Sequence, residues 1–362
     1  MTQSRTEPDI VLQARGLQRR FVIDKPIFGP VTEVRAVDGV DLQIRRGETF
    51  AIVGESGCGK STLARLLVRL IDPTEGEVMY DGKDISRLDA RQVRALRRDL
   101  QFIFQDPFSS LNPRMTVGAL IEEPLRAHGL GTRKQRREKV EALLSRVGLM
   151  PEHANRYPHE FSGGQRQRVG IARALASGPK VLIGDEPVSA LDVSIQAQVV
   201  NILEDLKDEF GLTLVVIAHD LAVIRHMADR VAVMYLGQIV EIAPVADLFR
   251  TPLHPYSETL IAAIPVPRVG ATRATSKVEG DLPNPISPPS GCRFHPRCPY
   301  AVDRCASQVP GLTDIGQGRS VACHRHAELT LDGLAADTGA RTTAAEKRFE
   351  NYRNARAGRA TR

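Results

Sequence analysis

Gly54-Glu55-Ser56-Gly57-Cys58-Gly59-Lys60-Ser61 is the stretch that decides the fold, because it matches G-x-x-x-x-G-K-[ST] at every fixed position. In such a loop, successive backbone N–H groups surround phosphate oxygens, Lys60 reaches toward the outer phosphates, and Ser61 offers a hydroxyl to Mg²⁺. Residues 49–53 before it predict a buried strand, and residues 61–70 after it predict a helix. This order indicates a nucleotide-binding α/β fold, and we include Thr62 in the predicted site.

A carboxylate pair follows a second apolar run, Val181-Leu182-Ile183-Gly184. This run predicts a central strand whose C-terminal end presents Asp185, a carboxylate suited to the Mg²⁺ shell. Glu186 comes next and is placed to orient or deprotonate an attacking water. Together with residues 54–61, the pair predicts hydrolysis of a nucleoside triphosphate.

Ser162-Gly163-Gly164-Gln165 lies 23 residues before Asp185 and opens a predicted helix over residues 166–176. A serine and two glycines at a helix N-terminus make a second anion site. Since the phosphate loop already occupies one side of the nucleotide, we expect this segment to close over the γ-phosphate held by another chain. The sequence therefore predicts a composite site that requires a dimer.

Taken together, these segments resemble the ATP-binding-cassette (ABC) family. Residues 161–165 are similar to its signature motif, with Phe161 in place of the commoner Leu. The resemblance implies a D-loop at residues 189–192 and a Gln105 that senses Mg²⁺ at the entrance to a helical insert. It also implies that His219, 34 residues past Asp185, bonds the γ-phosphate or the attacking water.

The same resemblance places an aromatic ring against adenine. Phe21 is the candidate for stacking and Phe28 is the alternative, while a packing role for either remains open.

Residues 104–115 and the late cysteines are similar to the ABC subfamily that energises di- and oligopeptide importers, and within it to the F-type ATPase subunit. The resemblance covers roughly residues 10–326 and implies ATP and Mg²⁺ as cofactors. It also implies a second, non-identical ATPase subunit, two transmembrane permease subunits and an extracytoplasmic peptide-binding protein as partners. Nickel, glutathione or sugars remain alternative cargoes, and a non-transport ABC ATPase is the remaining alternative function.

Composition and charge narrow the function classes. The net charge is +6, of which residues 341–362 carry +5, so the rest of the chain lacks the charge excess common in nucleic-acid binders. No apolar run approaches the roughly 20 residues of a membrane-spanning helix, and the N-terminal residues lack the apolar core of a secretory signal. We expect a peripheral protein on the cytoplasmic face of the cell membrane, without a nucleic-acid partner.

The expected fold is an α/β P-loop cassette with an antiparallel β subdomain. We assign residues 10–250 to the ATP-binding domain, with a helical insert at about 105–160 where residues 117–128 and 133–147 show helical periodicity. Residues 251–330 form a small C-terminal module after a rise in proline content. Residues 331–362 are expected to be a disordered basic tail.

Four cysteines lie in the C-terminal module, namely Cys292, Cys298, Cys305 and Cys323, with five, six and seventeen residues between them. The spacing matches neither C-x₂-C zinc patterns nor common ferredoxin patterns, so spacing alone leaves metal binding and unligated thiols equally open. The resemblance to peptide-importer ATPases favours a [4Fe–4S] cluster. Zinc is the alternative, with His295 or His324 as substitute ligands.

Overall fold

The phosphate loop begins where strand β3 (Thr49–Val53) ends, in the middle of a parallel ladder. Strands β8 (Thr213–Ala218) and β9 (Arg230–Tyr235) flank β3, and β7 (Val181–Asp185) and β6 (Leu100–Ile103) continue the sheet beyond β8. In this computed structural model, the described residues are 9–24, 31–189, 191–218, 220–264 and 283–334.

Both faces of the parallel ladder are buried. Phe50 and Ile52 of β3 point into one hydrophobic core, and Ala51 and Val53 point into the other. This follows from the two-residue period of a strand, which sends successive side chains to opposite faces. The continuous apolar runs seen in the sequence are therefore those of strands covered on both sides.

The other edge of this sheet is antiparallel and includes C-terminal residues. Strand β10 (Gln238–Pro244) pairs with β9, β12 (Arg319–Val321) pairs with β10, and β11 (Thr313–Gly316) pairs with β12. The strand order is β11-β12-β10-β9-β3-β8-β7-β6. The cysteine-containing region is thus hydrogen-bonded to the sheet that carries the phosphate loop.

A second, antiparallel sheet lies beside α1 (Lys60–Leu67) and has the order β2-β1-β4-β5. Its strands are β1 (Ile10–Asp24), β2 (Thr32–Arg45), β4 (Glu75–Tyr80) and β5 (Lys83–Asp84), followed by helix α2 (Ala90–Leu96). Apolar residues of α1, β1 and β2 share one core with Phe50, so α1 packs between the two sheets.

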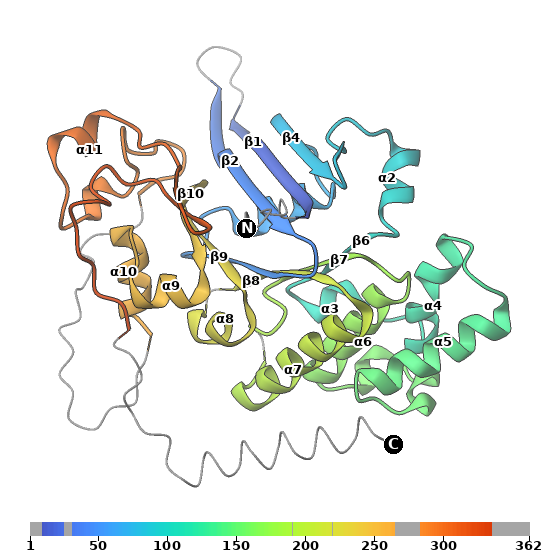
Figure 1. The fold of residues 1–362 in the computed structure, drawn as a ribbon. Coiled ribbons are helices and arrows are strands. Elements are labelled where there is room, and N and C mark those ends of the chain that lie inside the picture. Colours follow the sequence, from blue (N-terminus) through green and yellow to red (C-terminus); the bar gives the residue numbers. More distant parts are fainter. Residues whose placement is uncertain (1–8, 25–30, 190, 219, 265–282, 335–362) are drawn as a thin grey trace, which may run out of the picture.

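A helical insert lies on the opposite side of the molecule from the C-terminal region (Figure 1). It contains α3 (Pro107–Ser110), α4 (Val117–Ala127), α5 (Arg133–Arg146), α6 (Gly163–Leu175) and two 3₁₀ turns, Pro151–Asn155 and Pro158–Glu160, and α7 (Val193–Phe210) follows β7. Helix α5 begins at a capping box formed by Thr132 and Gln135, which satisfies N–H groups that the first turn leaves unpaired.

The C-terminal part contains short helices and an aromatic cluster. The helices are α8 (Leu221–Met227), α9 (Val245–Arg250), α10 (Pro255–Ala262) and α11 (Asp303–Ser307), with a 3₁₀ turn at His295–Arg297. Phe294 is 1% exposed, and its ring centroid lies 5.4 Å from that of Tyr235 and 5.3 Å from that of Tyr256. Phe294 therefore joins the C-terminal region to β9 and α10.

The predicted fold class is confirmed, including the antiparallel sheet and the helical insert. The predicted helix at residues 61–70 ends earlier, at Leu67, because Val68 caps α1 and Arg69 takes a φ of 56°. Helix α6 begins at Gly163, earlier than predicted, because Ser162 caps it. Within the described residues, no helix combines the length and apolar composition needed to cross a membrane.

Candidate nucleotide site

The phosphate loop turns tightly between β3 and α1, and two of its glycines leave no room for a side chain. Gly54 has a φ of 155°, and a Cβ there would lie 2.1 Å from the carbonyl oxygen of Met234 on β9. Gly59 has a φ of 106°, and a Cβ there would lie 2.0 Å from the carbonyl oxygen of Ala36 on β2. Both positions therefore require glycine.

Lys60 extends into the loop. Its side chain is 5% exposed, and its Nζ donates hydrogen bonds to the carbonyl oxygens of Gly54 at 2.7 Å and Glu55 at 2.8 Å. A buried ammonium requires such acceptors. A phosphate oxygen is a stronger, charged acceptor, so Lys60 is positioned to exchange these carbonyls for a phosphate.

Ser61 and Asp185 bring two oxygen ligands together at the start of α1. Ser61 Oγ donates a 2.7 Å hydrogen bond to Asp185 Oδ1. Asp185 is fully buried, and among the described residues its Oδ2 has no hydrogen-bond partner, while the Arg65 guanidinium stays 3.8 Å away. Burial raises the pKa of the Asp185 carboxyl. An incompletely satisfied carboxylate beside a hydroxyl fits Mg²⁺, which prefers oxygen ligands.

Gln105 and Glu186 meet although 81 positions separate them in the sequence. Gln105 Nε2 donates a 2.9 Å hydrogen bond to Glu186 Oε2. Glu186 has a φ of 48°, a left-handed conformation that non-glycine residues rarely adopt, and its N–H donates to the carbonyl oxygen of Ile217 at 3.1 Å. This turn carries the Glu186 carboxylate from the end of β7 toward Gln105.

One cavity of about 240 Å³ unites half of the predicted catalytic and nucleotide-binding residues, because it is lined by residues 56–62 together with Gln105 and Glu186. Six further lining residues were not predicted: Val34, Arg35, Ala36, Leu236, Gly237 and Pro285. No motif marks them, since they reach the cavity through the pairing of β2, the turn after β9 and the packing of the C-terminal segment.

Phe21 does not line this cavity. It is 38% exposed, and the Arg19 guanidinium lies 4.7 Å from its ring centroid. Its cross-strand partner Val34 does line the cavity. Stacking of Phe21 on adenine therefore stays a prediction, and the alternative, Phe28, lies outside the described residues.

The signature-like segment forms a well-capped helix start away from this cavity. Ser162 Oγ accepts a 3.3 Å hydrogen bond from the Gln165 N–H, and Gln165 Oε1 accepts a 3.0 Å bond from the Ser162 N–H. Ser162 itself is exposed. None of Ser162, Gly163, Gly164 or Gln165 is among the described residues that line the phosphate cavity. A single chain thus does not bring its own signature segment to its own phosphate loop.

His219 and Ala190, the latter in the predicted D-loop, lie outside the described residues, as does the predicted tail from residue 335 onward. Their predicted roles are untested.

The four C-terminal cysteines line one cavity, together with His254, His295 and His324. Burial raises the pKa values of Cys292 and Cys298 to about 11, and the neighbouring thiols act in the same direction. All four are free thiols. Among the described residues, no group of three or more His, Cys, Asp or Glu side chains is arranged to hold a metal. The donor types suit a metal, but the structure gives no support for the predicted cluster.

The loop geometry, the Ser61–Asp185 pair and the capped signature helix define an ATPase of the ATP-binding-cassette class. The ABC transporter family model matches residues 37–189, and the model for the oligopeptide/dipeptide transporter C-terminal region matches residues 240–305. The chain belongs to the ABC transporter ATPases that carry this C-terminal region.

Individual relatives agree with this assignment. The chain is 55% identical to the probable peptide ABC transporter ATP-binding protein y4tS of Sinorhizobium fredii, over 87% of this chain and 90% of the relative. It is 50% identical to the oligopeptide transport ATP-binding protein AppF of Bacillus subtilis, over 87% and 97% respectively. A dimeric, post-hydrolysis structure of the ATP-binding cassette MJ0796 with ADP and Pi matches with a TM-score of 0.59 and 31% identity, over 65% of this chain and 98% of that one.

Proposed function

We propose that this chain is the ATP-hydrolysing subunit that powers import of di- and oligopeptides across the cytoplasmic membrane. The observation that carries the proposal is the phosphate cavity, where the loop, Gln105 and Glu186 converge beside the buried Asp185. The C-terminal region and the peptide-transport names of the relatives support the cargo class. Nickel, glutathione or sugar remain alternative cargoes, since nothing in the cavity contacts cargo.

In the proposed reaction, backbone N–H groups of residues 54–61 and Thr62 hold the phosphates of ATP, and Lys60 moves from loop carbonyls to the outer phosphates. Ser61, Asp185 and Gln105 would hold Mg²⁺, which when bound neutralises phosphate charge. Glu186 accepts a proton from the attacking water, with its carboxylate oriented by Gln105.

His219 is assigned the γ-phosphate by family resemblance alone. Its variant His219→Ala should lower turnover more than ATP affinity.

The second half of each ATP site is proposed to come from a partner ATPase subunit. The exposed Ser162 and the following helix N-terminus supply anion-binding groups that the chain's own cavity does not use. The dimeric cassette structure with ADP and Pi supports this arrangement. We propose a related, non-identical ATPase as the partner, giving two composite sites.

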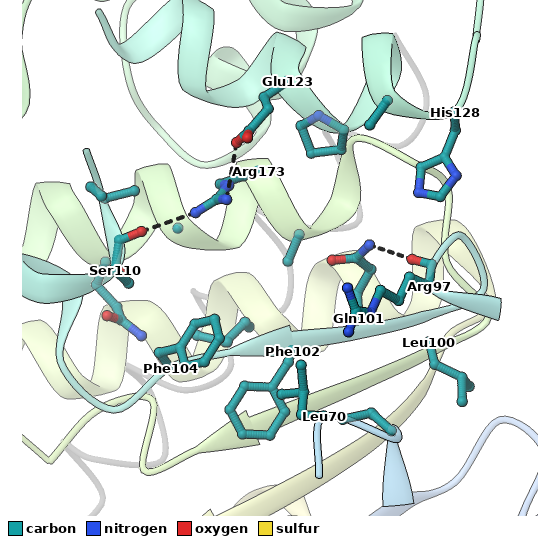
Figure 2. Close-up of a pocket in the computed structure, with 18 residues that line it drawn as sticks. Leu70, Arg97, Leu100, Gln101, Phe102, Phe104, Ser110, Glu123, His128 and Arg173 are labelled. Carbon is teal, nitrogen blue, oxygen red and sulfur yellow. Dashed lines mark hydrogen bonds and ion pairs between the residues drawn. The ribbon is translucent and has the colours of Figure 1, made fainter. Parts of the chain in front are cut away.

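The permease contact is proposed at a second cavity, of about 250 Å³, between β6 and helices α4 and α6 (Figure 2). Phe104 lines this cavity and is 42% exposed. It directly precedes Gln105 and so connects the cavity to the nucleotide site. Arg173 fixes the rim, donating to the Ser110 carbonyl oxygen at 2.9 Å and to Glu123 at 3.0 Å. If a segment of a permease subunit binds in this cavity, a movement of Gln105 on ATP binding would displace that segment.

The complete importer is proposed to contain two permease subunits and an extracytoplasmic peptide-binding protein, with this chain peripheral on the cytoplasmic face.

We also propose that the cysteine-lined cavity takes up a metal, as a [4Fe–4S] cluster or zinc. Iron, sulfide and zinc analysis of anaerobically purified protein tests this, because a metal-free protein with full transport activity would remove the proposal.

The variant Glu186→Gln tests the ATPase assignment. We expect ATP binding to persist and turnover to fall by about 10²-fold or more, the range of a lost general base. Glu138→Gln is the control, since Glu138 lies on the surface of α5 and pairs only loosely with Lys134 at 4.0 Å. Near-normal hydrolysis by Glu186→Gln would contradict the role of Glu186 as the base. Hydrolysis at full speed by a dilute monomer would contradict the proposal that the ATP site requires a dimer.

A further inference from the structure

The turn from Cys292 to Cys298 faces two sites at once. Both of its cysteines line the cysteine cavity. Between them, Arg293 extends toward the turn after β9 and Arg297 toward the phosphate loop. The turn is internally fixed, because the His295 N–H donates to the Cys292 carbonyl oxygen at 2.9 Å and the Cys298 N–H to that of His295 at 3.2 Å.

Arg297 forms a two-pronged ion pair with Glu55, the second residue of the phosphate loop. Its two terminal nitrogens lie 3.0 and 3.2 Å from the two carboxylate oxygens of Glu55. The side chains are only 10% and 24% exposed, so solvent screens the pair weakly. Arg297 also donates to the Tyr235 hydroxyl at 3.3 Å, which fixes the guanidinium plane.

The backbone of Glu55 is held from the same side. Its N–H donates a 2.8 Å hydrogen bond to the Tyr256 hydroxyl, and Tyr256 packs on Phe294 within the turn. The loop residue is therefore fixed at both its side chain and its main chain by groups that do not themselves line the phosphate cavity.

A second connection runs through Arg293. This guanidinium donates to the Leu236 carbonyl oxygen and to the carboxylate of Asp38. Leu236 and Gly237 line the phosphate cavity, and the Gly237 N–H donates to the Cys58 carbonyl oxygen at 2.8 Å. The turn therefore contacts the start of the phosphate loop directly, at Glu55, and its middle indirectly, through Leu236 and Gly237.

The charge of Glu55 explains why its ion pair with Arg297 affects nucleotide binding. A carboxylate in a loop that binds a polyanion repels its ligand unless a cation compensates it. We propose that Arg297 is a positioning residue for ATP binding, which neutralises Glu55 and holds it aside, so that rearrangement of the cysteine-lined turn changes ATP affinity. This inference rests on the proposed ATP site and extends it to the C-terminal module.

The test is nucleotide affinity of the full chain, measured with a fluorescent ATP analogue, alongside kcat and KM for ATP. Arg297→Met should weaken binding by about tenfold or more, as expected for one unpaired charge in a loop that binds a polyanion at an effective dielectric constant of about 20. KM should rise more than kcat falls. Arg297→Met combined with Glu55→Gln should regain most of the affinity, because the uncompensated carboxylate is gone.

Two further variants complete the design. Arg297→Lys keeps the charge and should lie between wild type and Arg297→Met, which preserves the test if the methionine variant folds poorly. Arg304→Met is the matched control, because Arg304 belongs to the same module but is exposed and donates to Gln308 on the surface. Its ATP affinity should equal that of the wild type.

The link to the turn is tested by hydrogen exchange. Since coupling between two sites is reciprocal, saturating ATP should slow exchange of the amides in residues 292–298 in the wild type and have less effect in Arg297→Met. Equal affinities of wild type and Arg297→Met, no recovery in the double variant, or unaltered exchange would each overturn the inference. A wild type that binds no ATP would instead overturn the proposed function.

Discussion

Replacing Gly59 with alanine adds one methyl group at the most crowded position of the phosphate loop. A Cβ there would lie 2.0 Å from the Ala36 carbonyl oxygen, about 1.4 Å inside the 3.4 Å at which ordinary contact begins. The backbone φ of 106° is itself unfavourable for every residue that carries a Cβ. Loop and β2 must therefore separate, or the loop must rotate.

The magnitude follows from two terms. The strained backbone costs about 1–3 kcal/mol, and forcing an extra carbon into a packed site costs about 1–3 kcal/mol more. Gly57→Ala is the matched control, because Gly57 lies in the same loop with a φ of 79° but has no atom within 4 Å of its Cβ position. Gly57→Ala should therefore show only the first cost.

The assay is urea unfolding of the nucleotide-free protein followed by circular dichroism, which is needed because the chain contains no tryptophan. We expect Gly59→Ala to be less stable than Gly57→Ala by about 1–3 kcal/mol. A loop displaced by about 1 Å should also lose about 10²-fold in ATP turnover. If Gly59→Ala were as stable as Gly57→Ala, the loop would not be packed against β2 as described.

Three further predictions follow from buried charges and the exposed aromatic. Burial raises the pKa of Asp185, so the charged carboxylate destabilises the fold once the pH rises above that raised pKa. Asp185→Asn should therefore be more stable than the wild type at neutral pH, and this difference in stability should disappear in acid. The variant should also lose its Mg²⁺-dependent turnover. Arg319 pairs with the fully buried Glu241 at 3.3 Å, so Arg319→Met should lower the free energy of unfolding by about 3 kcal/mol. The exposed variant Arg304→Met should leave the urea midpoint unchanged. Phe104→Ser should weaken co-purification with permease subunits without lowering the ATP affinity of the isolated chain. Phe210→Ser, which changes a similarly exposed phenylalanine at 41%, should leave both intact, and equal effects of the two variants would contradict the docking site.

The local features of the site could be predicted from the sequence because each is encoded in a short stretch. The strand at residues 49–53, the glycine-rich turn and the helix after it depend on contiguous residues, and the structure has all three. The placement of Asp185 at a strand end follows likewise from the apolar run before it. The capped start of α6 is encoded in the serine and glutamine of residues 162–165.

Tertiary structure alone decided which distant residues share the phosphate cavity. The pairing of Gln105 with Glu186 and the contacts of Arg35 and Pro285 depend on how strands and loops far apart in sequence pack. The ion pair of Arg297 with Glu55 spans 242 positions, and no local pattern distinguishes it from any other pair of opposite charges. Local backbone preferences act over a few residues, whereas such contacts exist only once burial of the two cores has fixed the sheet order.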